Sequence, residues 1–158
     1  MNLNKLIKDS LIFNEISGSD KEVSLESLGN QIKFTQDEAK ELKDSLSHFH
    51  LTGQNEGEIV KEALDVIVCA VGVLQKMQTL GYDITSCANI VGENNLSKYP
   101  CSHEEAMQSL QDLASKGVNA YVSYNPEYNA YVIRDVHEGK VRKPSGYQKV
   151  DSDSFKKG

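Results

Sequence analysis

The sequence lacks the long apolar runs that would place it in a membrane. No stretch approaches the ~20 consecutive apolar residues that a helix needs to cross a bilayer, so we expect no transmembrane helix. Residues 1–17 are interrupted by Asp9, Asn14 and Glu15 and contain no continuous apolar segment, which argues against a signal peptide. We therefore expect a cytoplasmic protein that does not engage a membrane.

Cysteines are few, and acidic residues outnumber basic ones by 23 to 17. Cys69, Cys87 and Cys101 form no Cys-x-x-Cys pair, and no histidine stands at zinc-finger spacing, so we expect reduced thiols rather than a disulfide framework or a zinc site. The formal net charge of −6 leaves no large basic surface for duplex nucleic acid. Small phosphorylated ligands fit this charge only where a metal ion or clustered lysines meet the phosphates.

What the sequence does contain is a series of helical patterns. Its 158 residues suit one domain with an appended subdomain. Residues 1–24 predict a short helix or arm that ends in a turn. Apolar residues that recur at spacings of three, four and seven residues predict a helix over 25–50. A second helix is predicted over 56–80, and its middle is apolar on nearly every side. A third, over 83–91, is predicted to end in the polar segment 92–95.

The character of the chain changes after Pro100. Ser102 followed by Glu105 has the form of a capping box and predicts the start of a helix that Lys116 and Gly117 close. Two runs rich in β-branched and aromatic residues, on either side of residues 125–127, predict a β-hairpin. We interpret Tyr121, Tyr124, Tyr128 and Tyr131 as strand residues rather than base-stacking groups.

These patterns predict a mainly α fold, an antiparallel helical bundle joined to a C-terminal helix and β-hairpin. The predicted division is an N-terminal arm or helix over 1–24, a helical core over 25–98, an αββ segment over 99–138 and a basic, extended tail over 139–158. No internal repeat is evident.

Pairs of acids mark the first two long helices. Asp37, Glu38 and Glu41 lie on the first, and Glu62 and Asp65 lie on the second, directly before its apolar run. Residues three apart lie on one helix face, so each pair can present two carboxylates side by side. An antiparallel hairpin of the two helices would bring the pairs together as a cluster of four carboxylates.

Such a cluster needs a compensating charge, because neighbouring carboxylates repel strongly in a partly buried site. All-oxygen ligation suits Mg²⁺ or Mn²⁺, and Mg²⁺ keeps coordination positions for the phosphates of a substrate. The alternative is that both pairs are solvated helix faces. A di-iron carboxylate bundle would need Glu-x-x-His motifs, and none of the four histidines follows a glutamate at that spacing.

Four motifs together resemble those of the MazG-type all-α nucleoside triphosphate pyrophosphohydrolases, which are related to phosphoribosyl-ATP pyrophosphohydrolase. The family has Glu-Glu-x-x-Glu on one helix and Glu-x-x-Asp on the next. This sequence has Asp37-Glu38-Ala39-Lys40-Glu41 and Glu62-Ala63-Leu64-Asp65. Asn95-Leu96-Ser97-Lys98 and the tail motif Gly-Lys-Val-x-Lys-x-x-x-Tyr, starting at Gly139, are similar to segments of phage-encoded members.

The resemblance implies Mg²⁺-dependent hydrolysis of a nucleoside triphosphate between its α and β phosphates, in the host cytoplasm if a phage encodes the protein. It also implies a homodimer or homotetramer. The αββ segment lies between the regions that resemble the family and would be an insertion. The implied catalytic metal ligands are Glu38, Glu41, Glu62 and Asp65, with Asp37 and Glu58 as weaker candidates. The implied substrate-binding residues are Asn95, Lys98, Lys140 and Lys143.

A second hypothesis belongs to a different class of protein. The aspartate at position 37, where the family has glutamate, and the αββ insertion are both compatible with a catalytically idle relative. Such a protein would bind a nucleotide or a protein partner through the insertion.

Overall fold

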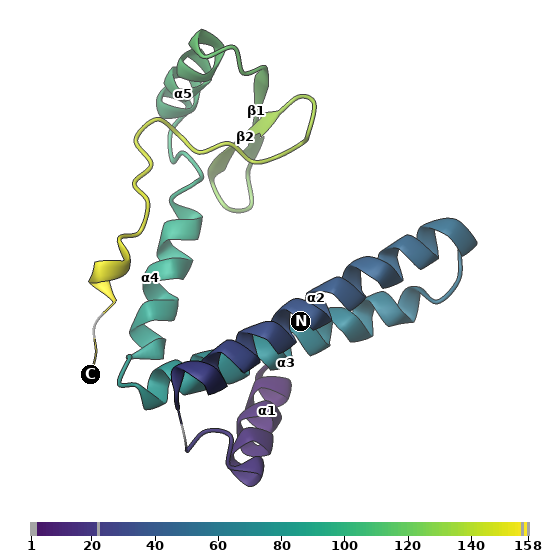
Figure 1. The fold of residues 1–158 in the computed structure, drawn as a ribbon. Helices are drawn as coiled ribbons and strands as arrows, with labels where there is room; N and C mark the ends of the chain where they lie inside the picture. The colour runs from purple at the N-terminus through teal and green to yellow at the C-terminus, as the bar shows by residue number, and fades with distance from the viewer. Residues whose placement is uncertain (1–2, 22, 156, 158) are drawn as a thin grey trace. The chain divides into compact units, whose positions relative to one another are not determined.

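The computed structural model describes residues 3–21, 23–155 and 157, and these form a mainly helical protein with one two-stranded antiparallel sheet (Figure 1). The chain divides into two compact units. The first unit contains residues 1–84 with 156–158, and the second contains residues 85–155. Among the described residues, no helix is both long and apolar enough to span a membrane.

The first unit is built on a helical hairpin. Helix α2 (Leu25–Thr52) and helix α3 (Glu56–Thr79) lie side by side and antiparallel, and α1 (Asn4–Ser17) packs against α3 (Figure 1). Ser24 begins α2, because its hydroxyl accepts a hydrogen bond from Ser27 N at 3.0 Å. Gly53, at φ 66°, ends α2 in the left-handed conformation. The predicted helices over 25–50 and 56–80 are confirmed.

Polar side chains fix how these helices pack. The amide of Gln31 on α2 donates to the backbone oxygen of Cys69 on α3 at 3.1 Å. A Cβ atom at Gly72 would lie 2.7 Å from Gln31 Nε2, so the glycine permits this close approach. Asn14 on α1 donates to Gln75 Oε1 at 2.8 Å and ties the N-terminal helix to the end of α3.

The second unit contains α4 (Ile84–Leu96, which starts at the unit boundary), α5 (His103–Ser115), β1 (Ala120–Asn125), β2 (Ala130–Asp135) and a short 3-10 turn at Ser152–Ser154. Ser102 caps α5 by accepting from Glu105 N at 3.1 Å, as predicted. The predicted hairpin is also confirmed, with Val122 opposite Ile133. Helix α5 covers one face of it, where Ala106 and Ile133 are fully buried.

The predicted end of the third helix was wrong. Residues 92–95 do not terminate it, and α4 continues to Leu96. A contact distant in sequence supports the last turn: Asn94 accepts from the Tyr147 hydroxyl at 2.6 Å and donates to the Gln148 backbone oxygen at 2.7 Å. Polar residues that are typical of a loop are therefore helical here, because the C-terminal tail supplies partners for Asn94.

An ion pair anchors the tail to the end of β2. The guanidinium of Arg142 binds one carboxylate oxygen of Asp135, and the other oxygen accepts from His137 N at 2.8 Å and Glu138 N at 3.0 Å. The bond from Arg142, followed by the two backbone bonds, lowers the pKa of Asp135 from 3.8 to about 2. The charged form of this carboxylate therefore stabilises the folded unit.

This shift predicts a pH dependence for the variant Asp135→Asn. Because the folded pKa is below the unfolded one, the stabilisation is complete above about pH 4 and is lost as pH falls through about 2. We expect urea unfolding to show a less stable variant at neutral pH and a smaller difference from wild type at about pH 2. Glu127→Gln, in the exposed hairpin turn, is the control and should keep the wild-type pH dependence. A constant difference between Asp135→Asn and wild type across this range would contradict the prediction.

Candidate metal centre

Three glutamates from the helical hairpin meet in the first unit. Glu38 and Glu41 lie one turn apart on α2, and Glu62 faces them from α3. One carboxylate oxygen of each lies within 4.8 Å of those of the other two. Among the described residues, these are the carboxylates that lie close enough to share one ion. The predicted cluster therefore forms in part, with three of its four members.

Glu62 has the environment that a bound cation would explain. Glu62 is only 6% exposed, and its Oε1 accepts a hydrogen bond from Lys61 Nζ at 2.7 Å. Its other oxygen, Oε2, is buried and has no hydrogen-bond partner. A buried carboxylate oxygen without a partner is costly, and coordination to a cation would satisfy it. The oxygen-only donor set fits Mg²⁺ or Mn²⁺.

Asp65 lies beside this trio but is not part of it. Its carboxylate is half-exposed and lies 3.3 Å from Lys61 Nζ. Lys61 thus bridges Asp65 and Glu62, and its hydrogen bonds to them raise the lysine pKa. Sequence reasoning missed Lys61, although a lysine four residues before an aspartate on a helix was a recognisable signal.

The surroundings of Glu38 disfavour its ionised form. Desolvation, followed by the charges of Glu41, Asp65 and Glu62, raises the pKa of Glu38, while Lys61 acts in the opposite direction. A raised carboxyl pKa means that the ionised form destabilises the fold, so stability decreases as pH rises through that pKa. A divalent cation bound between the carboxylates would reverse this effect.

We therefore predict that Mg²⁺ or Mn²⁺ raises the midpoint of thermal unfolding at neutral pH, and raises it less in acid, where protons compete for the carboxylates. Glu38→Gln should raise the midpoint without metal, because one of the repelling charges is removed, and should abolish most of the metal-dependent increase. Differential scanning fluorimetry with and without EDTA measures both effects. Asp44→Asn, exposed on the same helix, should respond to metal as wild type does. An equal metal response in Glu38→Gln would place the ion elsewhere.

A cavity of about 450 Å³ adjoins Glu38 in the same unit. The rings of Phe13 and Phe34 and the amide of Gln31 line it, together with Asp37 near the acidic trio. Sequence reasoning did not identify the two phenylalanines as site residues, because they come together only when α1 folds against the hairpin. The cavity has the size and the mixed apolar and polar lining of a small-molecule site.

The remaining predicted residues do not join this cluster. Glu58 is exposed, one turn before Glu62 on α3. In the second unit, Lys98 donates to the side-chain oxygen of Asn95, and the ammonium of Lys143 lies 4.3 Å from the centroid of the Tyr147 ring. Lys140 is exposed. The assignment of substrate-binding roles to residues of the second unit stays a prediction.

Comparisons with known proteins add no relative to this description. No family model matches the chain, no curated protein matches it, and no solved structure matches it.

Proposed function

We propose that the protein is a Mg²⁺-dependent nucleoside triphosphate pyrophosphohydrolase. Water would cleave the bond between the α and β phosphates of a ribo- or deoxyribonucleoside triphosphate, giving the monophosphate and pyrophosphate. The observation that supports this most is Glu62 Oε2, a buried oxygen without a hydrogen-bond partner, in a residue grouped with Glu38 and Glu41. The motifs that carry these acids are those on which the resemblance to the MazG-type family rests.

The charged residues of the centre would have different roles in this reaction. Glu38, Glu41 and Glu62 would hold the ion, which neutralises phosphate oxygens and activates water when bound. The Lys61 side chain is 58% exposed, and it would leave Asp65 to meet a phosphate of the arriving substrate. Asp65 would then be free to complete the predicted set of four carboxylates or to accept a proton from the attacking water.

The cavity beside Glu38 supports a nucleoside as the rest of the substrate. Phe13 and Phe34 offer rings against which a base can pack, and Glu38, a member of the trio, also lines the cavity. Gln31 donates its N–H group to Cys69, which leaves its carbonyl oxygen for an amino group on a base. A base in this cavity would place its phosphates toward the three glutamates.

Pyrophosphate release from a panel of nucleoside and deoxynucleoside triphosphates, with Mg²⁺ and with EDTA, tests the proposal. We expect metal-dependent release from at least one of them, and a monophosphate as the second product. Orthophosphate as the product would indicate cleavage of a different bond. Binding of nucleotides with no turnover in any metal would favour the catalytically idle alternative instead.

We also propose that a second copy of the chain covers the apolar surface of the first unit. Large apolar side chains are exposed along its helices, including Leu25 at 90%, Leu51 at 85% and Val60 at 62%. An interface with a second chain would remove such exposed apolar side chains from water. A homodimer or homotetramer, as the resemblance implies, would bury it.

Light scattering is predicted to give a mass at least twice the 17.5 kDa of one chain. Leu51→Glu should shift the protein toward the monomer, because burying a charge in an apolar interface is costly. Val136→Glu, at a 49% exposed position in the second unit, is the control and should keep the wild-type mass. A monomeric mass for the wild type at about 100 µM would overturn this proposal.

A further inference from the structure

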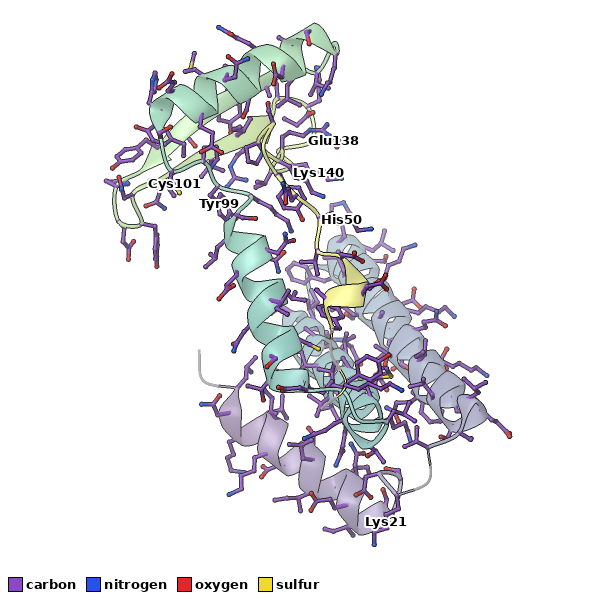
Figure 2. All side chains as sticks on the ribbon, turned by 90° about the vertical axis from the view of Figure 1, so that its left-hand side faces the viewer. Lys21, His50, Tyr99, Cys101, Glu138 and Lys140 are labelled. Carbon is purple, nitrogen blue, oxygen red and sulfur yellow. The ribbon has the colours of Figure 1, made fainter. Side chains whose placement is uncertain are left out.

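The β-hairpin of the second unit has one face that α5 does not cover. Side chains alternate along β2, so Ile133 and Tyr131 lie on the α5 side, where Tyr131 meets the His103 ring at 5.7 Å. Val132 and Arg134 lie on the opposite face. Together with the chain that follows α4, this opposite face lines a cavity of about 570 Å³. Figure 2 labels Tyr99, one of its lining residues, between the end of α4 and the hairpin.

Three side chains that line this cavity, Arg134, Asn125 and Asn129, offer hydrogen-bond donors. Among the described residues, Arg134 has no acidic partner, and one of its N–H groups donates to the Gly139 backbone oxygen at 3.2 Å. Asn125 uses its side-chain oxygen to accept from Glu127 N at 3.0 Å. Asn129 uses its oxygen to accept from the Tyr124 hydroxyl at 2.9 Å. Both amides therefore keep their N–H₂ groups as donors.

In the part of the chain that the structure describes, no aspartate or glutamate lines the cavity, although the chain as a whole carries a net charge of −6. A guanidinium and two amide N–H₂ groups without a carboxylate are complementary to an anion. Arginine in particular matches phosphate, because its planar fork can donate two hydrogen bonds at once. Arg142, by contrast, forms an ion pair with Asp135, whereas no ion pair of Arg134 occurs among the described residues.

The rest of the lining is aromatic and apolar. Tyr99 and Tyr128 contribute rings, and Val132 contributes the apolar floor. Tyr128 lies in the hairpin turn rather than in a strand and is 73% exposed, so packing within the fold does not account for it. Rings of this kind stack with planar bases of any sequence. A ligand that satisfies both halves of the cavity has a planar ring joined to an anion.

We propose that this cavity binds one nucleotide unit, with its base against Tyr99 and Tyr128 and its phosphate at Arg134. The site is distinct from the acidic trio and needs no metal ion. The same chemistry is offered by a free mononucleotide and by a nucleotide within a single strand. The proposal is independent of pyrophosphohydrolase activity, since a monophosphate is not a substrate for that reaction.

Titration of the full chain in EDTA, followed by ¹⁵N NMR and calorimetry, tests the site with AMP, adenosine and an eight-residue oligodeoxyadenylate. We expect AMP to shift the side-chain signals of Arg134, Asn125 and Asn129. Adenosine should bind more weakly than AMP by about tenfold or more, because it lacks the charge. Binding of AMP at least as tight as that of the oligonucleotide identifies a free nucleotide. Tighter binding of the oligonucleotide identifies a strand.

Two variants locate the binding. Arg134→Gln should weaken AMP binding by about tenfold or more, and Tyr128→Leu by about fivefold or more. Because Tyr128 is exposed, its replacement keeps the test valid even if Arg134→Gln disturbs the hairpin. Lys149→Gln removes a positive charge from the same unit outside the cavity and should bind as wild type does. Absence of shifts at the three side chains, equal affinity for adenosine and AMP, or wild-type binding by Tyr128→Leu would overturn the proposal.

Discussion

Replacement of Glu62 by glutamine is expected to reduce metal-dependent pyrophosphate release by about 100-fold or more. Even the outer partners of metal ligands contribute about 10- to 100-fold to affinity or activity, and Glu62 is the buried member of the trio. Glutamine has nearly the same shape but lacks the charge that would hold the cation. Steady-state pyrophosphate release and calorimetric titration of Mg²⁺ would both detect the loss.

The fold should tolerate this substitution. Glutamine keeps an oxygen that can accept from Lys61, and one of several repelling charges is removed, so we expect the free energy of unfolding without metal to change by no more than about 1 kcal/mol. Glu56→Gln, in the exposed first turn of the same helix, is the matched control and should retain activity. Wild-type metal dependence in Glu62→Gln would contradict the assignment of the site to this trio.

The sequence was sufficient to predict that the three glutamates come together, but not the ion pair of Lys61 with Asp65 beside them. Spacing of three on α2 and the short connection to α3 were enough to predict that Glu38, Glu41 and Glu62 come together. Asp65 pairs with Lys61, which binds Glu62 at the same time. The partner that a side chain takes is decided by local geometry, and the periodicity of a sequence does not encode it.

The same distinction applies to the fold. The start of α5 follows from Ser102, a local signal that acts within one turn. The last turn of α4 has a partner in the Tyr147 hydroxyl, which lies far along the chain, and local composition placed the boundary too early. The cavity beside Glu38 likewise needs Phe13 from α1 and Phe34 from α2. Local patterns therefore predicted the elements, whereas contacts between distant segments decided the details that shape the cavities.

Replacement of Ile133 by alanine is expected to destabilise the second unit by about 2–5 kcal/mol. Ile133 is fully buried on β2, and its strand packs against α5, where Ala106 is also fully buried. The cost combines lost burial with the cavity that remains. A small unit has only a few kcal/mol of stability in total, so most or all of its cooperative unfolding transition should be lost near room temperature.

Tyrosine fluorescence during urea unfolding can measure this effect selectively, because Tyr82 is the only one of the seven tyrosines outside residues 85–155 and the chain has no tryptophan. Val132→Ala, the adjacent residue on the opposite face of β2, is the matched control. Val132 is half-buried, so its truncation should cost less than that of Ile133. Equal losses from the two substitutions would contradict the arrangement in which α5 and the Ile133 face of the hairpin form the core of this unit.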